Sequence, residues 1–180
     1  MLHAILLNAK DLLDGILKLD KNIRFIGLLE KSGHLYSSIP IEGIVQHLTG
    51  RNSEVSLSQT AHIVQMRKSF STDLGDLKYI VYAHDKVLVF SIPILEDLIL
   101  VFSTEKDLNV NNIVPRIKDY ITSVESELTL EKPSKMVDEE KRRIVRNLYD
   151  SGITEDLIAE QMDLDINTVK TLIQESSAMV

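Results

Sequence analysis

Residues 78–104 read KYIVYAHDKVLVFSIPILEDLILVFST, and this stretch decides the fold. It contains three runs rich in β-branched and aromatic residues: Lys78 to Ala83, Val87 to Ile94 and Leu98 to Thr104. The short polar pairs His84-Asp85 and Glu96-Asp97 separate the runs. Runs of this length with tight turns between them predict a three-stranded antiparallel meander.

Two further strands and three helices complete this part of the chain. Ile23 to Leu29 is β-like, and after a turn at Gly33 the segment from His34 to Ile39 returns as the second strand of a hairpin. Apolar residues recur at helical spacing over residues 2–19, 56–74 and 110–128, with a loop expected over residues 41–55. This order predicts an α+β fold with a five-stranded antiparallel sheet and flanking helices.

The middle helix has two apolar sides. One side is formed by Leu57, Ala61 and Val64, and the other by Ile63, Met66, Phe70 and Leu74. Because burial of only one side would leave an apolar stripe in water, the second side predicts a contact with a partner.

The C-terminal quarter reads as three short helices. Apolar stripes run along Val137 to Gly152, along Thr154 to Met162, and along the helix that follows Asp165. Thr154 and Asp165 are suitable N-caps, and Asp163 between the last two helices tolerates the left-handed backbone of a tight turn. We therefore expect a trihelical domain over residues 135–176, joined by a short linker to a first domain over residues 1–130.

The last two helices are similar to the helix-turn-helix of sigma-factor region 4, resolvase-like and response-regulator output domains, above all in Asp165-Ile-Asn-Thr-Val-Lys-Thr-Leu172. The resemblance implies that the second helix enters the major groove of double-stranded DNA. The side chains expected to contact bases or phosphates there are Asn167, Thr168, Lys170, Thr171 and Gln174. Arg142, Arg143 and Arg146 on the preceding helix would neutralise further phosphates.

Local charge opposes this interpretation. From Ser134 to Val180 there are six Lys and Arg residues against ten Asp and Glu residues, a net charge of −4, whereas DNA-binding modules are usually basic. The alternative is a trihelical protein-interaction or dimerisation module with the same core.

Residues 1–128 resemble the Roadblock/LC7 and broader profilin-like fold, most closely its uncharacterised archaeal members. The resemblance rests on the hairpin Ile23-Arg-Phe-Ile-Gly-Leu-Leu-Glu-Lys-Ser-Gly-His-Leu35, the long middle helix and the final strand Glu96-Asp-Leu-Ile-Leu-Val-Phe-Ser-Thr104. It implies a homodimer paired through Gln59 to Phe70 and Lys78 to Tyr82, with contacts from Ile63, Met66, Phe70, Tyr79 and Val81. It also implies a scaffold or regulator near small GTPases, while relatives in the wider fold class sense small ligands.

Composition limits the remaining functions. The chain of 180 residues has no cysteine, which excludes disulfides and cysteine-based metal sites, and its net charge of −7 confines any nucleic-acid contact to a local patch. The N-terminus lacks the features of a secretory signal, and the apolar run from Val87 to Phe102 is too interrupted to span a bilayer. We therefore expect a cytoplasmic protein without a membrane partner.

Catalytic and cofactor motifs are missing from the sequence. The five histidines are scattered singly, without metal-ligand spacing, and there is neither a phosphate-binding loop nor a dinucleotide-binding fingerprint. We therefore expect no enzyme, no metal and no cofactor. The main hypothesis is a DNA-binding transcriptional regulator with an N-terminal dimerisation or sensor domain. The alternatives are a Roadblock-like protein-interaction scaffold or small-GTPase regulator that does not bind DNA, and a small-ligand sensor without DNA contact.

Overall fold

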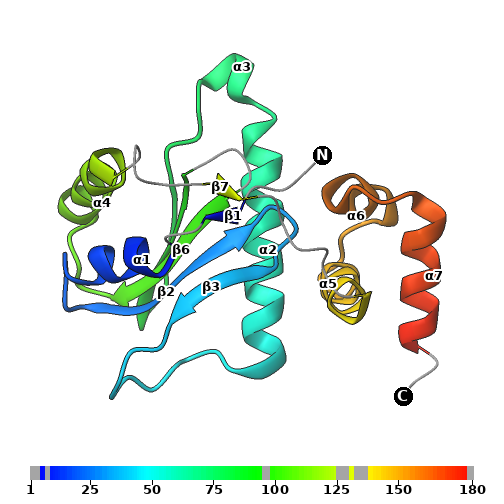
Figure 1. The fold of residues 1–180 in the computed structure, drawn as a ribbon, viewed down its shortest axis with the longest axis horizontal. Helices are drawn as coiled ribbons and strands as arrows, with labels where there is room; N and C mark the ends of the chain where they lie inside the picture. Colours follow the sequence, from blue (N-terminus) through cyan, green and yellow to red (C-terminus); the bar gives the residue numbers. More distant parts are fainter. Residues whose placement is uncertain (1–4, 7–8, 95–97, 125–129, 132–137, 178–180) are drawn as a thin grey trace.

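The centre of the structure, a computed structural model that describes residues 5–6, 9–94, 98–124, 130–131 and 138–177, is a five-stranded antiparallel sheet (Figure 1). Its strands are β2 (Ile23–Glu30), β3 (Leu35–Ile39), β4 (Ile80–Ala83), β5 (Val87–Pro93) and β6 (Leu98–Glu105). They lie in the order β3-β2-β6-β5-β4. The predicted hairpin and meander are confirmed, and pairing of β2 with β6 joins them into one sheet.

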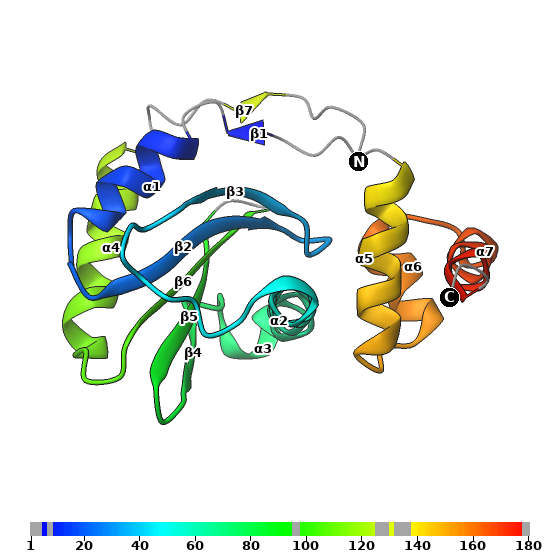
Figure 2. The same ribbon diagram turned by 90° about the horizontal axis from the view of Figure 1, so that it is seen from below.

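Helices α1 (Ala9–Leu17) and α4 (Val110–Val124) cover one face of this sheet (Figure 2). The main core lies between them and the strands, because alternate residues of β5 and β6 point to this face. Phe90 and Phe102 are direct cross-strand partners, and their rings stack with centroids 4.5 Å apart. Both side chains are fully buried.

Helix α2 (Gly50–Lys68) lies on the opposite face and covers only part of it (Figure 2). Of its two predicted apolar sides, the one with Ala61 and Val64 packs on the sheet, in a second cluster with residues of β2 and β6. Val89 of β5 and its partner Tyr82 of β4 point to the same face but are only half-buried. The α2 layer thus leaves the β4–β5 end of this face open.

Several predicted helix boundaries were wrong. Ile5 and Leu6 do not belong to a helix but form strand β1, which pairs with β7 (Leu130–Glu131) more than 120 residues away. Periodicity is a local signal and cannot reveal such pairing.

The middle helix begins at Gly50 rather than Ser56, and it ends at Lys68, so the short α3 (Ser71–Leu74) is separate. The expected turn at residues 96–97, residues 125–128 of the last predicted helix, and residues 132–134 of the linker lie outside the described residues.

The C-terminal part contains the three expected helices, α5 (Asp138–Asp150), α6 (Glu155–Met162) and α7 (Ile166–Ser177). They enclose an apolar cluster of their own: Ile144, Val145, Leu148, Ile158, Ala159, Val169 and Ile173. Asp163 adopts the left-handed conformation, with φ 54° and ψ 45°, and Asp165 accepts the backbone N–H groups of Asn167 and Thr168. Thr154 occupies the N-cap position of α6, but its side chain makes no capping hydrogen bond.

No helix among the described residues has both the length and the apolar character required to cross a lipid bilayer.

Candidate interaction surfaces

The outward side of α2 is apolar and open, as the sequence predicted. Met66 and Phe70 are 51% and 47% exposed, and Ile63 on the same side is half-buried. By contrast, Ala61 and Val64 on the inner side are fully buried. Large apolar side chains that share one helix face in water are characteristic of a contact surface.

A groove of about 540 Å³ runs beside this face, between α2 and the β4–β5 hairpin. Its apolar walls come from Ile63 of α2 and from Tyr82, Val87 and Val89 of the sheet. Partial burial raises the pKa of the Tyr82 phenol, while the charge of Arg67 acts in the opposite direction. The groove exists because α2 covers Tyr82 of β4 and Val89 of β5 only in part on this face.

The five side chains predicted at a dimer contact fall into two groups. Ile63, Met66 and Phe70 lie on α2 or directly after it, whereas Tyr79 and Val81 lie on the opposite face of the sheet. Val81 packs against the main core, and the Nζ atom of Lys118 on α4 lies 5.8 Å from the centre of the Tyr79 ring. The outer edge of β4, which ends the strand order, separates the two groups.

The C-terminal helices lie against a flank of α2 that the sequence did not single out (Figures 1 and 2). Gln161 of α6 is only 8% exposed, and its side-chain amide bridges two elements. The Oε1 atom lies 2.8 Å from Nδ1 of His62 on α2, and the Nε2 group donates to the Lys31 carbonyl oxygen in the β2–β3 turn at 2.8 Å. One buried side chain therefore connects the helical unit to both α2 and the sheet.

Helix α5 adds charged and polar contacts to the same junction. Glu54 of α2 accepts a hydrogen bond from Asn147 at 3.3 Å, and an ion pair joins Arg51 to Asp150. His34 of the β2–β3 turn contacts Glu140 at 2.8 Å. Among the described residues, the apolar clusters of the sheet domain and of the helical unit share no member. The junction is therefore held mainly by polar groups.

The arginines predicted to bind DNA phosphates lie partly in this junction. Arg143 is 3.7 Å from both Glu54 and Glu140, and Arg146 is 3.1 Å from Asp150. Together with Arg51, Glu54 and Asn147, the three predicted arginines line an open hollow of about 430 Å³ between α2 and α5. A DNA phosphate at Arg143 or Arg146 would have to compete with these carboxylates.

The predicted recognition face of α7 is accessible. Asn167, Lys170, Thr171 and Gln174 are exposed, whereas the Thr168 hydroxyl and backbone N–H donate to Asp165. The Thr168 hydroxyl and the backbone N–H groups of Thr168 and Asn167 donate hydrogen bonds to the Asp165 carboxylate and hold its pKa below the usual range. Lys170 lies 3.9 Å from Glu155 of α6, so the one basic side chain of this face has a carboxylate nearby.

Two polar residues of the junction, Asn147 and Gln161, were not singled out from the sequence. Asn147 stands beside Val145 and Leu148 in an apolar stripe, and Gln161 stands between Ile158 and Met162. Polar residues at such positions signal a buried hydrogen bond. Their partners, His62, Lys31 and Glu54, are about 90 to 130 residues away along the chain, so the spacing could not identify them.

Comparison with known proteins finds a match for the part of the chain that contains the sheet. A sequence model described as "Family of unknown function (DUF6659)" matches residues 8–133. No curated protein matches the chain. The helices α5, α6 and α7 lie beyond the matched range.

Solved structures of the Roadblock/LC7 type share the fold. The gliding protein MglB from Thermus thermophilus is 11% identical, with a TM-score of 0.53 over 67% of this chain and 90% of that chain. MglB from Myxococcus xanthus is 16% identical, with a TM-score of 0.51 over 68% and 98%. A Roadblock/LC7 domain from Streptomyces avermitilis is 14% identical, with a TM-score of 0.50 over 64% and 93%. At these identities the likeness shows the fold alone, and the Roadblock/LC7-like architecture expected from the sequence is confirmed at that level.

Proposed function

We propose that this chain, which belongs to DUF6659, a family of unknown function, is a protein-interaction module that pairs with a second copy of itself and presents a Roadblock-like surface to a protein partner. The outward face of α2, with Ile63, Met66 and Phe70, carries the proposal. The fold shared with Roadblock/LC7 structures supports it. The resemblance to that family in the sequence of residues 1–128 makes a small GTPase the first partner to test, by analogy. This reading replaces DNA binding as the leading hypothesis.

A homodimer explains both groups of predicted contact residues. A two-fold axis beside β4 would bring the outer edges of two β4 strands together and place the two α2 helices against each other on one face. Tyr79 and Val81 would then lie close to the same axis on the other face of the extended sheet. Both groups would contribute to one self-complementary contact.

The molar mass of the full chain in solution tests this proposal. Light scattering after size exclusion should give twice 20.4 kDa for the wild-type chain, and 20.4 kDa for a Met66→Glu, Phe70→Glu variant, because two buried carboxylates would oppose association. Leu157→Glu is a suitable control, since Leu157 is 40% exposed and lies on α6, away from the outward face of α2. A wild-type chain that stays monomeric at high concentration would exclude the homodimer.

A second candidate function is DNA binding by residues 135–176, which we retain because the side chains predicted to read bases, Asn167, Lys170, Thr171 and Gln174, are exposed on one helix. Its test is retention of genomic DNA fragments by the full chain at two salt concentrations. Binding through phosphates weakens steeply with salt, and a Lys170→Ala, Thr171→Ala variant should lose sequence-selective retention. Equal retention by this variant and by the wild type would reject the assignment.

A further inference from the structure

The side of α2 that faces the sheet changes character along the helix. In its second half this side carries Ala61 and Val64, which are fully buried against the strands. In its first half the residues at helical spacing are Ser53, Ser56 and Thr60, which line a hollow between the helix and the sheet. Because these side chains are small, they do not fill the space that larger apolar side chains would occupy.

Two adjoining hollows make up this space. The inner one, of about 170 Å³, lies between the start of α2 and strands β2, β5 and β6, and the outer one is the groove of about 540 Å³ beside the β4–β5 hairpin. The outer volume falls within the range of about 300–1,000 Å³ that is usual for small-molecule sites. The two share six lining residues: His47, Leu48, Ser56, Thr60, Val87 and Val89.

The segment that precedes α2 borders both hollows and is fastened to β2. The Arg24 guanidinium donates to the Val45 carbonyl oxygen at 2.9 Å, and the Gln46 side-chain amide donates to the Arg24 carbonyl oxygen at 2.9 Å. The next two residues, His47 and Leu48, line both hollows. These hydrogen bonds therefore hold the loop in place as one wall of the site.

The lining is mainly apolar and has little net charge. Val101 is 3% exposed, and Phe25, Leu57 and Val89 are half-buried. Within the inner lining, every member of which the structure describes, Arg24 is the one permanently charged side chain, and it forms an ion pair with Glu105.

The outer lining adds Asp85 and Lys86, which have opposite charges and are exposed. A charged ligand would lose hydration in these hollows without a compensating partner, so the lining favours an uncharged one.

We propose that these hollows bind one small uncharged organic molecule, with its hydrocarbon body against Phe25, Leu57 and Val89 and a hydroxyl or carbonyl group among the serine hydroxyls. Burial of the body removes apolar surface from water, and a serine hydroxyl can either donate to or accept from the polar group.

The site adjoins the proposed homodimer contact. Gln59, Thr60, Ile63 and Tyr82, which line the groove, belong to the two ranges through which the copies would pair. The residues that hold the hydrocarbon body lie outside those ranges.

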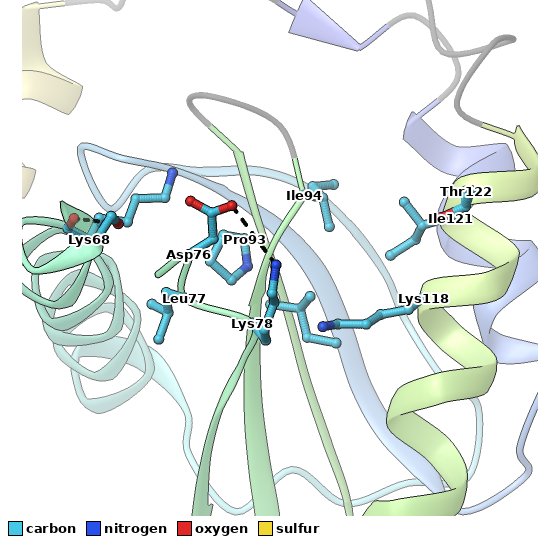
Figure 3. Close-up of a pocket in the computed structure, with 11 residues that line it drawn as sticks. Lys68, Asp76, Leu77, Lys78, Pro93, Ile94, Lys118, Ile121 and Thr122 are labelled. Carbon is cyan, nitrogen blue, oxygen red and sulfur yellow. Dashed lines mark hydrogen bonds and ion pairs between the residues drawn. The ribbon is translucent and has the colours of Figure 1, made fainter. Parts of the chain in front are cut away.

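A different hollow, of about 740 Å³, lies at the other end of β5 (Figure 3). Its lining includes three lysines from three parts of the chain, Lys68, Lys78 and Lys118, and the carboxylate of Asp76. Because the two hollows share no lining residue, NMR signals can tell which of them a probe enters.

Titration of the isotope-labelled full chain with 1-octanol and with 2-naphthol, followed by NMR, tests the proposal. At least one of these probes should shift the backbone signals of residues 47–48, 56–60, 87–89 and 101–103 and reach saturation. Octanoate adds a charge and ethanol lacks most of the hydrocarbon, so each should bind at least about tenfold more weakly than octanol. Equal binding of octanoate, shifts confined to residues 76–78 and 118–122, or no saturable shift with either probe would overturn the proposal.

A matched pair of variants makes the test specific. Ser56→Leu places a larger side chain in the space shared by the two hollows and should reduce affinity for the bound probe at least about tenfold, because the ligand can no longer bury its hydrocarbon there. Ser123→Leu makes the same change at an exposed position of α4, outside both hollows, and should leave affinity unchanged. Circular dichroism verifies that both variants fold. An equal loss in both variants, or no loss in the first, contradicts the site.

The Met66→Glu, Phe70→Glu variant separates this proposal from the homodimer. Neither residue lines the hollows, so the variant should bind the probe within about threefold of the wild-type affinity, whatever the molar mass of either chain. Loss of binding in this variant would place the probe on the outward face of α2 and overturn the proposal.

Discussion

The Nδ1 atom of His62 on α2 lies 2.8 Å from the Oε1 atom of Gln161 on α6, although the two residues are 99 positions apart in the chain. The same amide of Gln161 donates to the Lys31 carbonyl oxygen, so it holds α2, the β2–β3 turn and the helical unit together. One side of α2 faces the sheet, a second faces the C-terminal helices, and only the third, with Met66 and Phe70, is left for a partner.

Replacement of Gln161 by leucine tests the junction. The substitution removes the amide partner of the Lys31 carbonyl oxygen and of His62 at a position that is only 8% exposed, so we expect a loss of about 1–3 kcal/mol in the free energy of unfolding. Urea denaturation measures it. Gln174→Leu, at an exposed position of α7, should change the same quantity by less than about 0.5 kcal/mol. Equal effects would show that Gln161 is not a structural contact.

We expect the largest loss in the free energy of unfolding from a substitution in the stacked pair of the main core, Phe90 and Phe102. Phe102→Ala removes a fully buried ring from its contact with Phe90, and the cavity should cost about 3–5 kcal/mol. Phe70→Ala removes the same side chain from an exposed position and should cost less than about 1 kcal/mol in the monomer. Chemical denaturation of both variants at low protein concentration gives the comparison, and similar costs would contradict the assigned core.

The turn between β2 and β3 depends on Gly33. Its φ is +90°, and a Cβ atom there would lie 2.9 Å from the Cα atom of Ser58 on α2. Gly33→Ala should therefore combine backbone strain of about 1–2 kcal/mol with a steric clash between the turn and the helix. Gly43→Ala has similar strain, with φ +75°, but meets no atom within 4 Å. Thermal unfolding should rank the variants in that order, and the reverse order would refute the close approach.

Asp165 makes the start of α7 sensitive to pH. Its pKa is lowered in the folded chain, mainly by the hydrogen bond from the Thr168 hydroxyl, so its stabilising contribution is fully present above the pKa of the unfolded chain, about 3.9. The contribution is lost as the pH falls through the lower folded value. The difference in melting temperature between the wild type and Asp165→Ala should thus be larger at pH 7 than at pH 2.5. A difference that grows toward low pH would contradict this sign.

Local patterns in the sequence were sufficient for much of the fold. The runs rich in β-branched and aromatic residues between Lys78 and Thr104, with the turns that separate them, predicted β4, β5 and β6, and the stripe of Ile113 and Ile117 predicted α4. Asp163 and Asp165 predicted the turn and cap between α6 and α7. Each of these features depends on residues a few positions apart, so sequence spacing contains the necessary information.

Only part of the candidate surfaces could be predicted from the sequence. The second apolar side of α2 was visible in Ile63, Met66 and Phe70, because helical periodicity places these residues together. Glu54, a partner of Arg143 that weakens the case for DNA binding, was not visible, because it comes from a different element. Asp150, by contrast, lies four residues after Arg146 on the same helix, a spacing that the sequence does show.

The sequence by itself determined the five strands of the main sheet, most of the helices and which faces of them are apolar, because these properties follow from the periods of the backbone. Only the tertiary structure decided that the C-terminal helices lie against α2 through Gln161 and His62, and that Lys68, Lys78 and Lys118 line one hollow. Both arrangements join residues 10 to about 100 positions apart, and the packing of whole elements, rather than any local preference, brings such residues together.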